Sequence, residues 1–134
     1  FLNGNTDYSL VRGPAGTDCC HNSVPFKAVG AVFPIPYDFD FSGLVDAPYA
    51  EPNPQFRIRT VKTRVYRGRC FNNERLPDTL AYFREKKTAI YSLVDSLTDL
   101  DAGNRGEVID YLDAFYEIAE DPAQTEKAMT RECT

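Results

Sequence analysis

The chain has 134 residues, enough for one compact domain and too few for two of ordinary size. Its 43% hydrophobic and 26% charged residues exclude a disordered or collagen-like chain. The net charge of −5 argues against bulk binding to nucleic acid. The sequence contains no apolar run of about 18 residues, so we predict no membrane span.

Charge and proline divide the chain into two parts. Residues 1–76 carry nine Lys and Arg against seven Asp and Glu, whereas residues 77–134 carry six against 13. Seven of the nine prolines lie in the first 54 residues. We therefore expect an α+β protein over 1–134, either a single domain or a fragment, with a loop-rich β-hairpin region over 1–76 and two or three packed helices over 77–134.

The first part contains one clear hairpin signal. Residues 3–23 are rich in Gly, Asn and Asp, which predicts loops. Val24 to Ile35 reads as two strands joined by a turn at Val29-Gly30. Three prolines make residues 46–55 irregular, and the alternation in Phe56 to Tyr66 predicts an extended segment.

The second part has helical spacing. Asp78 is expected to cap a helix from Thr79 to about Leu97, followed by a turn over Asp99 to Gly106. A second helix is expected over 107–120, and Asp121-Pro122 predicts the start of a third, short helix. The expected core positions recur at three- and four-residue steps, namely Leu80, Phe83, Ile90, Val94 and Leu97 on one helix and Val108, Leu112, Phe115 and Ala119 on the next. Six aromatic residues are expected in the core or between helices: Tyr82, Phe83, Tyr91, Tyr111, Phe115 and Tyr116.

The four cysteines lack the spacing of a zinc cluster. Cys19 and Cys20 are adjacent and are not expected to bond to each other, because such a bond strains the intervening peptide. Two alternatives stay open. In the first, either Cys19 or Cys20 pairs with Cys70 in an oxidising compartment. In the second, all four cysteines are reduced, mostly buried thiols.

Polar side chains gather around the ends of the predicted hairpin. Asn22 precedes the first strand, and Asp38 and Asp40 follow the second. Because a hairpin brings its ends together, an amide oxygen and a carboxylate can meet one cation there, and both are ligands that Mg²⁺ accepts. Asp7, on an upstream loop, is then free to orient an attacking hydroxyl.

The order of these motifs resembles the catalytic half of kinase-like phosphotransferases: GNTD at residues 4–7, HN at residues 21–22, the hairpin, and PYDFD at residues 36–40. The pattern is most similar to the atypical kinases of the spore-coat CotH type and of the HipA and lipid-kinase types, and it covers residues 1–45. The resemblance implies a kinase C-terminal lobe with Asp7 as the catalytic residue. It implies Asn22 and Asp38 as metal ligands, and Asp40 as a second ligand or a structural carboxylate.

The pattern departs from that of protein kinases in two places. Fourteen residues separate Asp7 from Asn22, many more than in the kinase catalytic loop, and no Gly-rich loop or strand lysine precedes them. The chain begins at Phe1 rather than Met, so we expect a processed product or a fragment.

The resemblance implies the C-terminal part of a Mg-dependent (or Mn-dependent), ATP-using phosphotransferase that is inactive alone. Its partners would be a nucleotide and an unidentified acceptor. Two alternatives stay open: a non-catalytic interaction domain with a kinase-like shape, and a metal-dependent phosphohydrolase using Asp38 and Asp40. Segments like CCHN and PYDFD are similar to those of exported bacterial proteins of unassigned function. Both an exported or periplasmic and a cytoplasmic location are therefore kept.

Structural interpretations stand beside these hypotheses. Asp38 and Asp40 are also typical of turns, because Asx side chains accept hydrogen bonds from nearby backbone N–H groups. His21 fits a hydrogen-bonded structural residue better than a base. The basic segment from Arg57 to Arg69 suits a solvated face, or else a phosphate or acidic-partner site formed by Arg57, Arg59 and Arg64.

Overall fold

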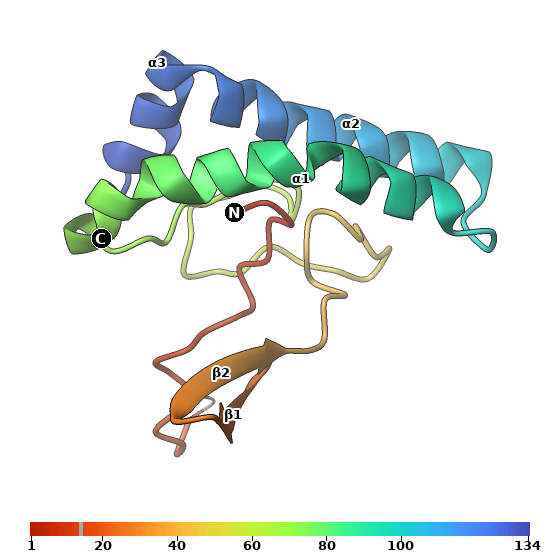
Figure 1. Ribbon diagram of the computed structural model, residues 1–134. Coiled ribbons are helices and arrows are strands. Elements are labelled where there is room, and N and C mark those ends of the chain that lie inside the picture. Colours follow the sequence, from red (N-terminus) through yellow and green to blue (C-terminus); the bar gives the residue numbers. More distant parts are fainter. Residues whose placement is uncertain (14) are drawn as a thin grey trace. The chain divides into compact units, whose positions relative to one another are not determined.

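A computed structural model describes residues 1–13 and 15–134. The described residues form a small α+β fold with one two-stranded antiparallel sheet and three α-helices, as predicted (Figure 1). The chain divides into two compact units. We call Asn3–Val65 the hairpin unit, and Phe1–Leu2 with Tyr66–Thr134 the helical unit. Among the described residues, no helix combines the length and the apolar character that a membrane span requires.

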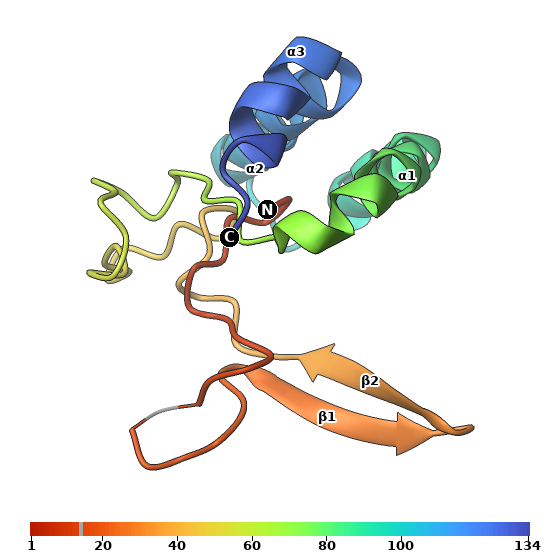
Figure 2. The ribbon, with the colours of Figure 1, turned by 90° about the vertical axis from the view of Figure 1, so that its left-hand side faces the viewer.

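The hairpin has the predicted position and turn. Strand β1 (Ser23–Ala28) pairs with β2 (Ala31–Pro36) in an antiparallel hairpin (Figure 2). The register of the two strands sets Phe26 opposite Phe33. Val29 and Gly30 connect the strands with φ values of 49° and 76°. Positive φ at both central residues is what a type I′ turn requires, and this turn matches the right-handed twist of the strands.

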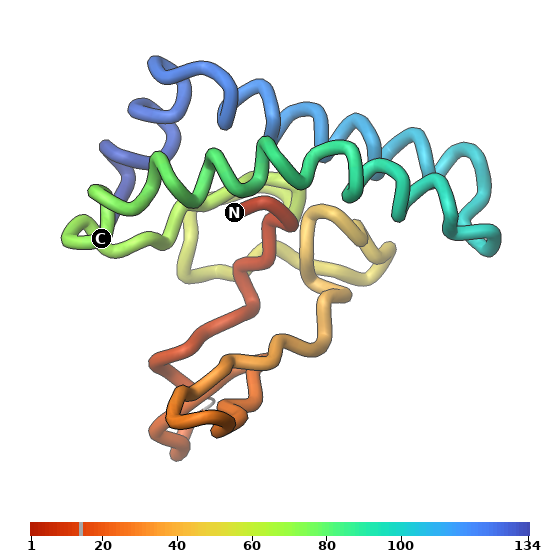
Figure 3. The backbone as a smooth tube through the Cα atoms, viewed as in Figure 1, coloured from red at the N-terminus to blue at the C-terminus, as the bar shows by residue number. Residues whose placement is uncertain are grey.

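Apart from β1 and β2, the described residues of the hairpin unit form no β-strand. The chain after β2 runs through successive irregular loops (Figure 3). The predicted extended segment over Phe56 to Tyr66 is wrong. The Thr63 N–H donates to the Thr60 carbonyl at 3.1 Å, so the chain turns there. Alternation was a poor guide here because an extended segment needs a partner strand to satisfy its backbone groups.

The first long helix starts earlier than predicted. Helix α1 (Leu76–Ser96) follows directly on the 3₁₀-helix η1 (Cys70–Arg75), and its N-cap is Arg75 rather than Asp78. Pro77 lies in the first turn, where its missing N–H costs no intrahelical hydrogen bond. The preceding 3₁₀ turn supplies the start of the helix, so a side-chain cap at Asp78 is not needed.

The second helix also starts earlier, whereas its end is as predicted. Helix α2 (Ala102–Glu120) begins inside the predicted turn because the Asp101 side chain accepts hydrogen bonds from the N–H groups of Gly103 and Asn104. Asp121 caps α3 (Pro122–Thr125) in the same way, which confirms the predicted short helix. A π-helical turn, η2 (Glu126–Thr130), continues from α3 and was not predicted.

The core of the helical unit lies between α1, α2 and η2. It is built from Leu80, Phe115, Tyr116, Ala119 and Met129. The Phe115 ring makes edge contacts with the rings of Phe83 and Tyr116. Two predicted core positions are wrong, because the exposed fraction of Tyr82 is 57% and that of Leu97 is 47%. Leu97 is the C-cap of α1, so it has left the buried face of the helix.

Both predicted states of the cysteines are wrong. Cys70 bonds to Cys133 and Cys19 bonds to Cys20, and the described chain has no free cysteine. The first pair forms because the C-terminus returns to η1. The Cys70 N–H donates to the Thr134 carbonyl at 3.2 Å, and the Thr134 N–H donates to the Gly68 carbonyl at 3.0 Å. Sequence distance gave no indication of this return.

Candidate functional site

The GNTD loop is fastened to the segment that follows PYDFD. Asn5 and Ser42 form an isolated antiparallel bridge, and the Leu44 N–H donates to the Asn3 carbonyl at 3.1 Å. Ser42 is fully buried, and Gly4 has a φ of 64°, a conformation that suits glycine. Two segments about 40 residues apart in sequence are thereby held side by side within the hairpin unit.

Asp7 lies between this bridge and a second one. The Ser9 and His21 backbones exchange hydrogen bonds of 3.0 and 2.9 Å, which brings the HN motif beside the GNTD loop. The Asp7 N–H donates to the Asn5 side-chain oxygen at 2.8 Å, an Asx turn that fixes the backbone of Asp7. The fourteen residues between Asp7 and Asn22 therefore do not keep the two side chains apart in space.

Both carboxylate oxygens of Asp7 have a partner. Nε2 of His21 lies 3.1 Å from Oδ1 of Asp7, and Nδ2 of Asn22 donates to Oδ2 at 3.0 Å. Nδ2 of Asn22 also donates to the Asp7 carbonyl at 2.8 Å. The Asp7 side chain remains 33% exposed, so the carboxylate is oriented yet accessible to a second molecule.

Asn22 is positioned by the open end of the hairpin. Its carbonyl accepts a hydrogen bond from the Tyr37 N–H at 3.0 Å, and its φ of 52° is one that Asn adopts more readily than most residues. The described hydrogen bonds of its side chain are both made through Nδ2, so Oδ1 has no donor among the described residues. This amide oxygen has the chemistry of a cation ligand.

Asp38 follows Tyr37 and faces like charge. The pKa of its carboxyl is raised above the ordinary 3.8, first by a hydrogen bond with the Asp40 side chain and then by desolvation and the charge of Asp40. The charge of Asp7 makes a further, smaller contribution that raises the pKa in the same direction. Its φ of 57° again marks a backbone held in the left-handed region.

Asp40 is used mainly inside the structure. Its Oδ1 accepts a hydrogen bond from the Phe41 N–H at 2.9 Å, and its Oδ2 accepts one from the Tyr49 hydroxyl at 3.2 Å. The pKa of Tyr49 is raised, chiefly by that hydrogen bond to Asp40. These bonds support the structural interpretation of Asp40, which steadies the turn that carries Asp38.

The residues fit a divalent cation only in part. No three His, Cys, Asp or Glu side chains of the described residues are grouped closely enough to hold a metal ion. The candidate donors are the amide oxygen of Asn22, beside Asp7, and the carboxylate of Asp38, which follows Tyr37, whose N–H donates to the Asn22 carbonyl. Mg²⁺ tolerates such a sparse set, because it usually keeps several waters and takes one or two carboxylates together with phosphate oxygens.

None of the contacts described above joins the predicted arginine site to the cluster around Asp7. Arg57 and Arg59 are exposed and Arg64 is half-buried, all on the irregular segment before Val65. The neighbouring Lys62 pairs with Asp46 at 2.8 Å. A phosphate or acidic-partner role for the arginines stays a prediction.

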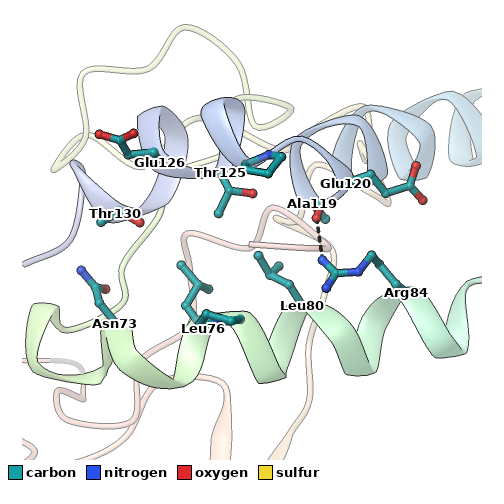
Figure 4. A pocket seen from close by; sticks show the side chains of 11 residues that line it. Asn73, Leu76, Leu80, Arg84, Ala119, Glu120, Thr125, Glu126 and Thr130 are labelled. Carbon is teal, nitrogen blue, oxygen red and sulfur yellow. Dashed lines mark hydrogen bonds between the residues drawn. The ribbon is translucent and has the colours of Figure 1, made fainter.

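A cavity of about 390 Å³ lies in the helical unit, between α1 and the segment from the end of α2 to η2 (Figure 4). Leu80 lines it, and its charged groups have intramolecular partners. Arg84 donates to the Ala119 carbonyl at 2.8 Å, and Glu120 pairs with Lys87 at 2.8 Å. The bond from Arg84 satisfies a carbonyl near the end of α2, where the helix leaves carbonyl groups without intrahelical partners. Because these charged groups serve the fold, we place the candidate site in the hairpin unit instead.

Sequence reasoning missed the supporting residues Ser42 and Tyr49, and it included Asn5 only as part of the GNTD motif. Asn5 carried a signal, because Asn two residues before Asp7 is typical of an Asx turn. Ser42 and Tyr49 act through contacts that form only on folding. Comparison with protein-family models, with curated proteins and with solved structures finds no match to the chain.

Proposed function

We propose that the chain is the C-terminal part of a magnesium-dependent, ATP-using, kinase-like phosphotransferase and is inactive alone. Asp7 orients the acceptor hydroxyl, Asn22 and Asp38 hold the cation, and Asp40 positions Asp38. When bound, the cation neutralises charge on the transferred phosphoryl group. The acceptor is a hydroxyl compound reached by the exposed part of the Asp7 carboxylate.

One observation supports this proposal above all: Asn22 contacts Asp7 across fourteen intervening residues, and the Asn22 carbonyl accepts a hydrogen bond from the N–H of Tyr37, the residue before Asp38. Asn22 touches Asp7 directly, and Asp7 influences the pKa of Asp38. The mutual repulsion of Asp38 and Asp40 is a state that a divalent cation relieves. A cation thus has an electrostatic reason to bind there, and the resemblance of the motifs supplies the reaction class.

The Cys70–Cys133 disulfide supports an oxidising location. Structural disulfides persist in exported and periplasmic proteins, and cytosolic proteins rarely keep them. Within this proposal the protein therefore acts outside the cytoplasm, and its nucleotide is met there.

The test is calorimetric titration of the full-length protein with Mg·ATP. We expect Asp38→Ala to abolish the cation-dependent binding of nucleotide, because a ligand of the cation is removed. Asp46→Ala is the matched control, since Asp46 is an exposed carboxylate of the same unit that pairs with Lys62. Unchanged binding by Asp38→Ala rejects the role of Asp38.

A second candidate function is a non-catalytic interaction domain, favoured by the exposed apolar surface of the hairpin. Val24 faces Ile35 and Phe26 faces Phe33 across the strands, and all four side chains are about half exposed. Exposed apolar surface of this kind is typical of contacts with another protein. If the unmodified full-length protein binds no Mg·ATP, this second function is favoured.

A further inference from the structure

The Cys19–Cys20 disulfide lies next to the residues that hold Asp7. His21 and Asn22 follow it directly in the chain, and both contact the Asp7 carboxylate. His21 is also the residue whose backbone pairs with Ser9. Whatever restrains Cys19 and Cys20 therefore restrains the start of the segment that orients Asp7.

This disulfide does not staple the fold. A disulfide stabilises a protein mainly by restricting the unfolded chain, and the effect grows with the length of the loop that it closes. Cys70 and Cys133 are 63 positions apart, whereas Cys19 and Cys20 are neighbours and close no loop of this kind. The effect of the Cys19–Cys20 bond is local, on the adjoining backbone.

The bond is also within reach of other molecules. Cys19 is exposed and Cys20 is half-buried. Both lie in the segment between Ser9 and His21, which the bridge between these two residues closes into a loop, and the hairpin follows this loop in the chain. Thiol–disulfide exchange needs such access, because a thiolate must approach one sulfur along the axis of the bond. Exchange here does not require the unit to unfold.

We propose that Cys19 and Cys20 form a thiol–disulfide exchange site that takes a dithiol reductant and regulates the Asp7 cluster. The regulatory part rests on the proposed function; the exchange site itself does not. Reduction loosens the chain before His21 and weakens its hold on Asp7, and reoxidation restores that hold.

The exchange is balanced by the dithiol. One thiolate of the reductant attacks Sγ of Cys19, the S–S bond breaks, and Cys20 leaves as a thiolate that takes up a proton. The second thiolate of the reductant attacks the mixed disulfide and releases Cys19, which is protonated in turn. The protein gains two electrons and two protons, and the dithiol is oxidised to its cyclic disulfide.

The first measurement is hydrogen exchange of the Ser9 amide, which is bonded to the His21 carbonyl. We expect its exchange rate to rise about fivefold in Cys19→Ser/Cys20→Ser, the effect of weakening one hydrogen bond. Wild-type protein treated with dithiothreitol should show the same rise once alkylation shows Cys19 and Cys20 reduced. The Leu44 amide, bonded to the Asn3 carbonyl in the same unit, is the internal control and should not change.

The second measurement is the affinity of the full-length protein for Mn²⁺ with ATP, which we expect to be about fivefold weaker in the same double variant. If Ser9 exchange is unchanged while Cys19 and Cys20 are reduced, the inference is overturned even where Mn²⁺ binds normally. If Ser9 exchange rises but neither form binds Mn²⁺ and ATP, the exchange site stands and the proposed function fails.

Discussion

The Cys70–Cys133 disulfide gives the most quantitative prediction, for the variant Cys70→Ser/Cys133→Ser. The bond joins positions 63 residues apart, so it closes a loop that contains α1, α2 and α3. In the loop-entropy treatment a loop of this length restricts the unfolded chain by about 4 kcal/mol near room temperature. We therefore expect the free energy of unfolding of the helical unit to fall by about that amount.

The assay is urea unfolding followed by the far-ultraviolet helical signal, which comes mainly from α1 and α2. Cys19→Ser/Cys20→Ser is the matched control, because it also removes two cysteines but opens no long loop. The control should change the free energy of unfolding of the helical unit by less than about 0.5 kcal/mol. Equal losses in both variants would refute the loop-entropy reasoning, as would a loss below about 1 kcal/mol for Cys70→Ser/Cys133→Ser.

Two further predictions concern the helical unit. Phe115→Ala removes a ring that is 2% exposed, so we expect the free energy of unfolding in urea to fall by about 3–5 kcal/mol. Tyr82→Ala at the surface should lower it by less than about 1 kcal/mol, and similar losses in the two variants would contradict the assigned core. The pKa of Asp101 is lowered from 3.8, chiefly by the hydrogen bond from the Asn104 N–H. The stabilisation of α2 by the ionised Asp101 cap is therefore fully present above pH 3.8 and is lost as the pH falls through the lowered pKa. Asp101→Ala should lack this acid-dependent component, and identical acid-unfolding profiles would speak against it.

The local features of the fold could be predicted because neighbouring residues determine them. The turn at Val29-Gly30 and the alternation around it define the hairpin. Asp121 followed by Pro122 defines the start of α3. The helical spacing of Leu112 and Phe115 marks the buried face of α2. Each of these signals acts within a few residues, where sequence order and spatial order coincide.

The errors arose where a distant segment decides the local structure. Helix α1 starts at Leu76 because η1 runs into it, and η1 is held by the returning C-terminus through Cys70 and Cys133. The segment over Phe56 to Tyr66 alternates like a strand, yet no strand among the described residues pairs with it. Alternation and capping describe only what a segment can do, and the partner available decides what it does.

The sequence by itself determined the hairpin, the helical faces and the residue types of the candidate site. Only the tertiary structure decided that Asp7 contacts His21 and Asn22. These contacts depend on two isolated bridges, Ser9–His21 and Asn5–Ser42, which join segments that are not neighbours in the sequence. Such contacts form when buried backbone groups find hydrogen-bond partners across the unit, and this requirement leaves little trace in the order of residues.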